Sequence, residues 1–155
     1  MARGKTKKRD IIQDPVYNNV MVAKFINHIM RRGKKFIARK IVYDAFDIIK
    51  EKTKKDALEI FDLAINNASP SMEVSSKRIG GAVYQVPREV KGEKRIGLAI
   101  RWLIIAAKAK KGKSMKEKLS EELLAASKNE GAAVKKKNDT HRMAEANKAF
   151  AHFTR

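Results

Sequence analysis

The stretch from residue 72 to residue 90 restricts the fold most, because a helical period of apolar residues gives way there to a period of two. Gly80-Gly81 lies between two β-prone runs, and consecutive glycines readily adopt the positive φ that a type I′ turn needs. The stretch therefore predicts an antiparallel hairpin. Its register would pair the following residues: Ile79 with Ala82, Lys77 with Tyr84, Ser75 with Val86, Glu73 with Arg88, Arg78 with Val83, Ser76 with Gln85 and Val74 with Pro87.

The predicted hairpin has no purely apolar face, since aliphatic, aromatic and basic side chains occur on both sides. An ordinary half-buried hairpin has one apolar and one polar face. Two interpretations follow: an arm that leaves the body at its root and contacts a charged partner further out, or a plain surface hairpin with solvated lysines. At ~3.3 Å per residue, such an arm would reach roughly 30 Å. Pro87 has no N–H to donate, so the second strand is an edge or is bulged there.

Apolar residues in the rest of the chain have the spacing of amphipathic helices. Helices are expected over about residues 20–32, 34–52, 56–69, 94–110 and 114–129, and residues 132–155 form one helix or two shorter pieces. The sequence thus predicts a mainly α fold in a single domain, residues 1–155. This is a bundle of about six helices with one protruding β-hairpin arm, residues 72–90, inserted between the third and fourth helices.

Polar residues at the expected helix starts support these boundaries. Asn18 or Asn19 caps the first helix, and Asp56 caps the third. Ser114 and Glu117 have the spacing of a capping box at the start of the fifth.

The charge of the chain indicates the kind of partner. With 36 basic and 17 acidic residues, the formal net charge is +19, which indicates that the binding partner is a polyanion. The chain has no cysteine, which excludes disulfides and zinc ribbons. Its charged start lacks the apolar run of a signal peptide, and its most apolar run, residues 98–107, is too short to span a bilayer. A soluble intracellular protein is expected.

Three basic or aromatic features each have two interpretations. Residues 1–10 form a flexible basic arm that orders on a phosphate backbone, or a plain solubilising tail. The cations of Arg31–Lys35 flank the glycine at position 33. They form a binding site for phosphate, or they only complement the dipole at the end of a helix, although one or two cations would be enough for that second role. Trp102 fills the core or stacks on a base.

Nothing in the chain predicts catalysis. The three histidines, at positions 28, 141 and 152, have no metal-site spacing. No glycine-rich loop follows a strand, and no serine lies in a nucleophile-elbow context. We therefore expect a protein that is not an enzyme and needs no cofactor or metal.

The hairpin sequence R-I-G-G-A-V-Y-Q-V-P, at Arg78–Pro87, resembles that of the bacterial small-subunit ribosomal protein seven family. The resemblance is collinear over almost the whole chain. Its other blocks are Asp14-Pro15-Val16-Tyr17, Gly33-Lys34-Lys35, Ala99-Ile100-Arg101-Trp102, Lys116–Leu124 and His141–His152. The last block, H-R-M-A-E-A-N-K-A-F-A-H, is the most specific.

The resemblance implies a structural constituent of the small ribosomal subunit on a cytoplasmic ribosome, with an organellar ribosome as the alternative. Members of the family bind the 3′ major domain of 16S-type rRNA directly and nucleate assembly of the subunit head. They lie at the subunit interface near the exit-site tRNA and the mRNA path. The implied protein neighbours are ribosomal proteins nine and eleven of the small subunit, and neither a membrane nor DNA is implied.

The resemblance also implies roles for individual residues. The rRNA-binding positions would be Arg3, Lys5, Lys7, Lys8, Arg9, Arg31, Arg32, Lys34, Lys35, Lys77, Arg78, Arg95, Arg101, Lys110, Lys111 and Arg142. The part of the arm near tRNA and mRNA would be Lys77, Arg78, Gly80, Gly81, Tyr84, Gln85 and Arg88, with Tyr84 and Gln85 meeting unstacked bases. Protein contacts would involve Lys148, Phe150 and His152.

The chain departs from the family pattern in two places. Ser75-Ser76 stands where relatives carry more basic residues, and Phe153-Thr154-Arg155 ends the chain where another aromatic is expected.

Other classes of protein fit the sequence less well. A DNA-bending protein would also combine helices with β-arms, and it would insert an apolar side chain, often a proline, between base pairs. Here the tip of the arm is Gly80-Gly81, which has no such side chain, and Pro87 lies near the root of the arm, too far from the tip to be inserted. An RNA-modifying enzyme would need a loop that binds its cofactor, and the sequence shows none. A basic helix that lies on a membrane surface would need no apolar core, whereas the periodic apolar residues here indicate a packed bundle.

Overall fold

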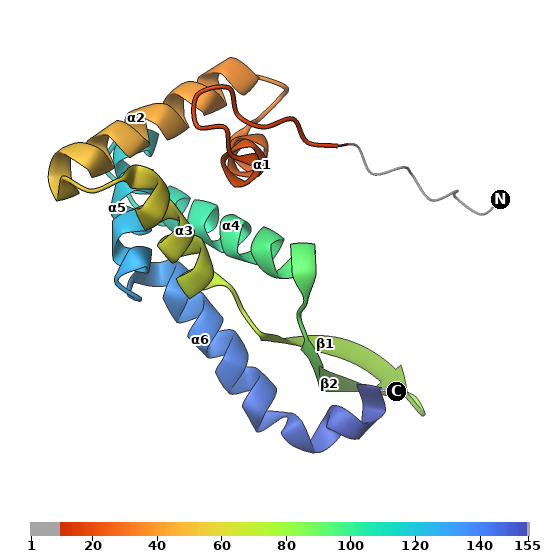
Figure 1. Ribbon diagram of the computed structural model, residues 1–155. Helices are drawn as coiled ribbons and strands as arrows, with labels where there is room; N and C mark the ends of the chain where they lie inside the picture. The colour runs from red at the N-terminus through yellow and green to blue at the C-terminus, as the bar shows by residue number, and fades with distance from the viewer. Residues whose placement is uncertain (1–9, 155) are drawn as a thin grey trace. The chain divides into compact units, whose positions relative to one another are not determined.

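The computed structural model describes residues 10–154 and is mainly helical (Figure 1). Its elements, in chain order, are α1 (Val20–Ile29), α2 (Lys35–Thr53), α3 (Ala57–Ala68), β1 (Met72–Ile79), β2 (Ala82–Glu89), α4 (Gly92–Ala109), α5 (Met115–Ser127), α6 (Gly131–Ala146) and a 3-10 helix, η1 (Lys148–Thr154). The predicted bundle of about six helices, with a hairpin between the third and fourth, is confirmed. Apart from Asp10, the predicted N-terminal arm lies outside the described residues.

The chain divides into two compact units between Lys40 and Ile41, within α2. The expectation that residues 1–155 form a single domain stays a prediction.

The first unit is built on a turn that starts at Asp14. The buried carboxylate of Asp14 accepts hydrogen bonds from the backbone N–H groups of Val16 and Tyr17, at 3.2 and 3.1 Å. Asn19 then caps α1, because its side-chain oxygen accepts from the N–H two residues on, at 2.7 Å. The alternative cap, Asn18, instead occupies the turn, with a φ of 46°.

Helix α1 ends at Ile29, earlier than the predicted end at about Arg32. Met30 leaves the helical region with a ψ of 133°. Arg32 and Gly33 follow with φ values of 51° and 72°, which a right-handed helix excludes. Gly33 therefore lies in the turn that leads to α2 and not at the end of α1.

The core of the second unit is formed by the apolar sides of α3, α4 and α5, which contact one another. Phe61 on α3 is fully buried, and its ring centre lies 5.4 Å from that of Phe46 in the later part of α2. Leu103 of α4 and Leu123 of α5 are fully buried as well. At 1.5–3 kcal/mol for each large apolar side chain, roughly, this burial is the main stabilising contribution to the unit.

Trp102 does not lie fully in this core, although core filling is the more usual role of tryptophan. Its ring is half-buried and lines a shallow apolar groove with Ile105 of α4 and Ala132 of α6. The side chain is therefore partly accessible to solvent.

A buried carboxylate joins α5 to α6. The side chain of Glu122 is 1% exposed, its Oε1 accepts from the N–H of Ala133 at 3.0 Å, and its Oε2 lies 3.1 Å from Lys110 Nζ. Gly131, with a φ of 92°, starts α6 so close to this group that an added Cβ would lie 2.9 Å from Oε1. Because the carboxylate binds on two sides, it fixes the start of α6 against α5.

The predicted hairpin forms with the predicted register, from the pair of Glu73 and Arg88 to that of Ile79 and Ala82. The glycines of the Gly80-Gly81 turn have φ values of 56° and 90°, as a type I′ turn requires. Figure 1 shows the hairpin extending from α3 and α4, with α6 and η1 beside it. The arm is therefore covered on one side by the C-terminal part of the chain.

The C-terminal residues form two pieces, which decides between the two alternatives that the sequence left open. The helix α6 stops at Asn147, whose N–H bonds to the carbonyl of Met143 at 3.1 Å, and η1 follows. Within α6, Met143 and Ala146 are exposed, whereas Ala144 is buried.

Replacing Glu122 by alanine should lower the free energy of unfolding by about 2–4 kcal/mol, because the change leaves the N–H of Ala133 without its acceptor and removes the nearer carboxylate of Lys110. Urea denaturation measures the loss. The matched control is Glu121→Ala, which removes an adjacent, more exposed carboxylate that also lies near Lys110, at 3.9 Å. Equal losses in the two variants would contradict a special role for the buried group.

Candidate nucleic-acid interface

The loop between α1 and α2 carries a cluster of cations. Its conformation is fixed by two backbone hydrogen bonds, from the N–H of Lys34 to the carbonyl of Arg31 at 3.0 Å and from that of Lys35 to Gly33 at 2.8 Å. Arg31, Arg32, Lys34 and Lys35 are all exposed. Within residues 10–154, none of these four side chains forms an ion pair with a carboxylate. Their charge is therefore available to an external anion.

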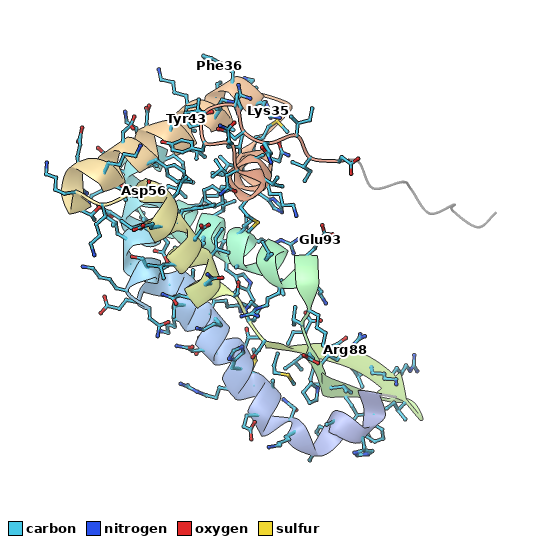
Figure 2. The ribbon with its side chains drawn as sticks, viewed as in Figure 1. Lys35, Phe36, Tyr43, Asp56, Arg88 and Glu93 are labelled. Atoms are coloured by element: carbon cyan, nitrogen blue, oxygen red, sulfur yellow. The ribbon has the colours of Figure 1, made fainter. Side chains whose placement is uncertain are left out.

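The hairpin also carries exposed cations. Arg78 is exposed next to the glycine turn, and Arg88 is exposed towards the root of β2, where Figure 2 labels it. Lys77 donates from Nζ to the backbone carbonyl of Phe153 at 2.6 Å, which ties the strand to η1. Lys77 and Arg88 also line a shallow groove with Ser75 and Ser76.

The ring of Tyr84 is packed against the C-terminal segment. Its centre lies 5.4 Å from the ring of Phe150 and 5.2 Å from that of Phe153. The neighbouring Gln85 donates from Nε2 to Ser76 Oγ at 2.9 Å, across the hairpin. That these two residues read unstacked bases stays a prediction, and Phe150 and Phe153 already occupy part of the tyrosine surface.

The structure brings the predicted arm residues together with the predicted protein-contact residues. Phe150 packs on Tyr84, as described, and His152 lies against Phe153 with ring centres 3.9 Å apart. Lys148 pairs with Glu145 at 3.3 Å on the exposed side of the segment. No sequence motif predicts this contact, because the residues involved are more than sixty positions apart.

The remaining predicted cations are spread over α4, the loop after it, and α6. Arg95, Arg101, Lys111 and Arg142 are exposed. Lys110 differs from them, because it is only half-exposed and its ammonium is paired with Glu122 as described above. A role of Lys110 in RNA binding stays a prediction, and its observed role is structural. The predicted N-terminal positions Arg3, Lys5, Lys7, Lys8 and Arg9 lie outside the described residues.

The root of the hairpin depends on a histidine whose role the sequence did not reveal. Nε2 of His141, on α6, accepts the backbone N–H of Ser71 at 3.0 Å, one residue before β1. The pKa of His141 lies below its ordinary value, because burial disfavours the charged ring and the charges of Lys137 and Arg95 oppose it further. A neutral ring is the form that accepts this hydrogen bond. Lys94 and Glu73 add an ion pair between α4 and β1.

Among residues 10–154, no three histidine or acidic side chains lie close enough together to hold a metal ion. Over the same residues, no helix has both the length and the apolar character needed to cross a membrane.

Exposed, unpaired cations on a helical scaffold with a two-stranded arm define a basic nucleic-acid-binding protein of structural type. The chain belongs to the family described as ribosomal protein S7p/S5e, whose model matches residues 1–148. It is 60% identical over 153 residues to small ribosomal subunit protein uS7 of Thermotoga maritima, and 61% identical over 153 residues to that of Thermotoga neapolitana, with 99% of each chain covered in both cases. The uS7 of a Clostridium botulinum strain is 58% identical over 151 residues, with 97% of each chain covered.

Family membership confirms several predictions. The chain is a structural component of the small ribosomal subunit and not an enzyme, and rRNA binding is the general role of its family. The predicted place on a cytoplasmic ribosome follows from the same finding.

Replacing Tyr84 by alanine should loosen the C-terminal segment, because the variant loses two aromatic contacts worth roughly 0.5–1.5 kcal/mol each. Hydrogen exchange of the amides of residues 148–154 should become about tenfold faster or more. Tyr84→Phe is the control and should exchange like the wild type, since it keeps the ring. Unchanged protection in the alanine variant would show that the segment is held by other contacts.

Acidification should weaken the attachment of the hairpin root through His141. Because the pKa of His141 is lowered in the folded chain, the unfolded chain binds the proton more readily, and stability rises with pH through this window. The contribution is present above the ordinary pKa of about 6.5 and is lost as pH falls towards the folded value. His141→Gln keeps an acceptor that does not titrate, so the wild type should lose more unfolding free energy than this variant between about pH 8 and pH 5. Parallel losses would exclude the histidine as the cause.

Proposed function

We propose that this chain binds the 3′ major domain of small-subunit rRNA directly and nucleates assembly of the subunit head. The observation that carries the proposal is the cluster of Arg31, Arg32, Lys34 and Lys35, which has no carboxylate partner within residues 10–154. A net charge of +19 and membership of a ribosomal protein family support it. Folded RNA presents phosphates in many directions, so separate clusters of cations suit it better than one flat patch.

The RNA-binding surface that we propose combines several cationic segments. It consists of Arg3, Lys5, Lys7, Lys8, Arg9, Arg31, Arg32, Lys34, Lys35, Lys77, Arg78, Arg95, Arg101, Lys110, Lys111 and Arg142. Lys110 makes the weakest case among the described members, because moving its ammonium to a phosphate would leave the buried carboxylate of Glu122 unpaired.

The hairpin is the element that we propose to lie near exit-site tRNA and mRNA, at the subunit interface. Its exposed Arg78 and the glycines at its turn allow close approach to a nucleic-acid backbone. For Lys148, Phe150 and His152 we propose contacts with a neighbouring ribosomal protein, protein eleven, and protein nine is the second proposed neighbour. The contact between η1 and β2 supports treating the two sites as one surface.

A salt series tests the proposal, with three ligands: the 3′ major domain, an unrelated folded RNA of equal length, and duplex DNA. The ribosomal fragment should stay bound at salt concentrations that release the other two, because shape and 2′-OH contacts add to the phosphate contacts. If all three ligands dissociate along one slope, the protein acts only as a polycation and the proposal fails.

A charge-matched pair of double variants locates the contact. Arg31→Gln with Arg32→Gln should reduce the salt slope by about 1.5, as expected for two lost phosphate contacts. Lys54→Gln with Lys55→Gln removes the same charge from another loop, where Lys54, like Arg32, has positive φ. This control should leave the slope unchanged, and equal effects would contradict a specific role for the first loop.

A further inference from the structure

An aromatic side chain stands exposed beside the cationic loop. Phe36, in the first turn of α2, is 78% exposed, and it is the only phenylalanine, tyrosine or tryptophan of residues 10–154 that is mainly exposed (Figure 2). Burial of a phenylalanine side chain normally contributes roughly 1.5–3 kcal/mol to stability, and most of that contribution is absent at Phe36. The adjacent Ile37 is 52% exposed and extends the apolar surface.

The helix geometry explains why Phe36 does not reach the interior of its unit. Two positions along an α-helix correspond to a rotation of about 200°. Ala38 is 3% exposed and marks the buried side of α2 in this turn, so Phe36 lies on the opposite side. An inward movement of the ring would require α2 to turn about its own axis.

The surroundings of the ring are strongly positive. Lys34 and Lys35 precede it directly, Arg31 and Arg32 lie in the same tight loop, and all four are exposed. An apolar partner would have to desolvate these cations, which is costly. RNA satisfies both features at once, because its phosphates neutralise cations while its unpaired bases stack on aromatic rings.

We propose that Phe36 is a stacking platform for an unpaired RNA base whose flanking phosphates are bound by the cations of Arg31–Lys35. This inference rests on the proposed binding of rRNA and adds to it a residue that contacts a base. The loop would then contribute to RNA-binding affinity in a way that does not depend on charge. Every base has a flat face that can stack on the ring, and stacking releases no counterions. The cations and the ring together would bind a base in a single-stranded loop or bulge. A base inside a duplex is already stacked between its neighbours and is not accessible to the ring.

Binding of the 3′ major domain by Phe36 variants tests this inference. Phe36→Ala should bind about 5- to 150-fold more weakly at a fixed salt concentration, which is the usual range for loss of one stacked base. Its salt slope should equal that of the wild type, unlike that of the arginine double variant. Phe36→Tyr should bind like the wild type, and Phe36→Leu, which keeps apolar bulk without the ring, should resemble the alanine variant.

A fluorescence measurement reports the contact directly. With Trp102→Phe as background, Phe36→Trp places the only indole of the chain at the proposed platform. Its emission should be quenched when the 3′ major domain is added. Leu63→Trp in the same background is the control, since Leu63 is also exposed, at 51%, but belongs to α3 in the other unit and has no neighbouring cations in sequence. The control should show no quenching.

The outcomes separate this inference from the proposed function. If the wild type does not distinguish the ribosomal fragment, the proposed function fails and the inference fails with it. If the wild type does distinguish it but Phe36→Ala binds equally well, only the stacking role is wrong. An alanine variant with a lowered melting temperature would show that Phe36 packs within the protein. Normal RNA binding with weaker retention on assembled subunits would assign it to a protein partner, and each of these results overturns the inference.

Discussion

The buried carboxylate of Glu122 is the constraint on which the arrangement of the second unit depends. It accepts a backbone N–H at the start of α6 and pairs with Lys110 at the end of α4, so that one side chain sets where three helices meet. The direction of α6 in turn carries η1 along the hairpin, where Phe150 and Phe153 meet Tyr84. The position of the arm therefore follows from a polar contact at the far end of α6 as well as from its own root.

The distribution of charge follows from a shortage of carboxylates. With 17 acidic residues against 36 basic ones, one-to-one pairing would leave 19 cations without a carboxylate. Several acids serve the fold: Asp14 holds the first turn, Glu122 the start of α6, and Glu73 the root of the hairpin. The loop around Gly33 receives none of them in the described residues, and its cations stay exposed. The positive charge of such a protein is compensated only when a polyanion binds, as expected for a component of a ribonucleoprotein.

The hairpin and the helix caps show how much of the fold was predictable. Its register, the Gly80-Gly81 turn and the capping box at Ser114 follow from residues close together in the chain, and all were confirmed. The candidate site was predictable only as a set of cations and aromatics. Which of them were engaged inside the protein was not, as Lys110 and Tyr84 show. Those contacts join residues separated by a dozen positions or by more than sixty, beyond the reach of any local pattern.

By itself, the sequence determined the helical class, the inserted hairpin with its register and the polyanionic partner, because period, turn chemistry and net charge are local or additive properties. The family followed from a resemblance over almost the whole chain. The tertiary structure alone decided that α1 stops at Ile29, that the chain after Gly131 breaks into two pieces, that His141 supports the hairpin root, and that Phe36 stays exposed. The physical reason is that burial and hydrogen bonding depend on which distant surfaces meet. An apolar or polar residue has the same local signature whether it ends in a core, in a contact or in solvent.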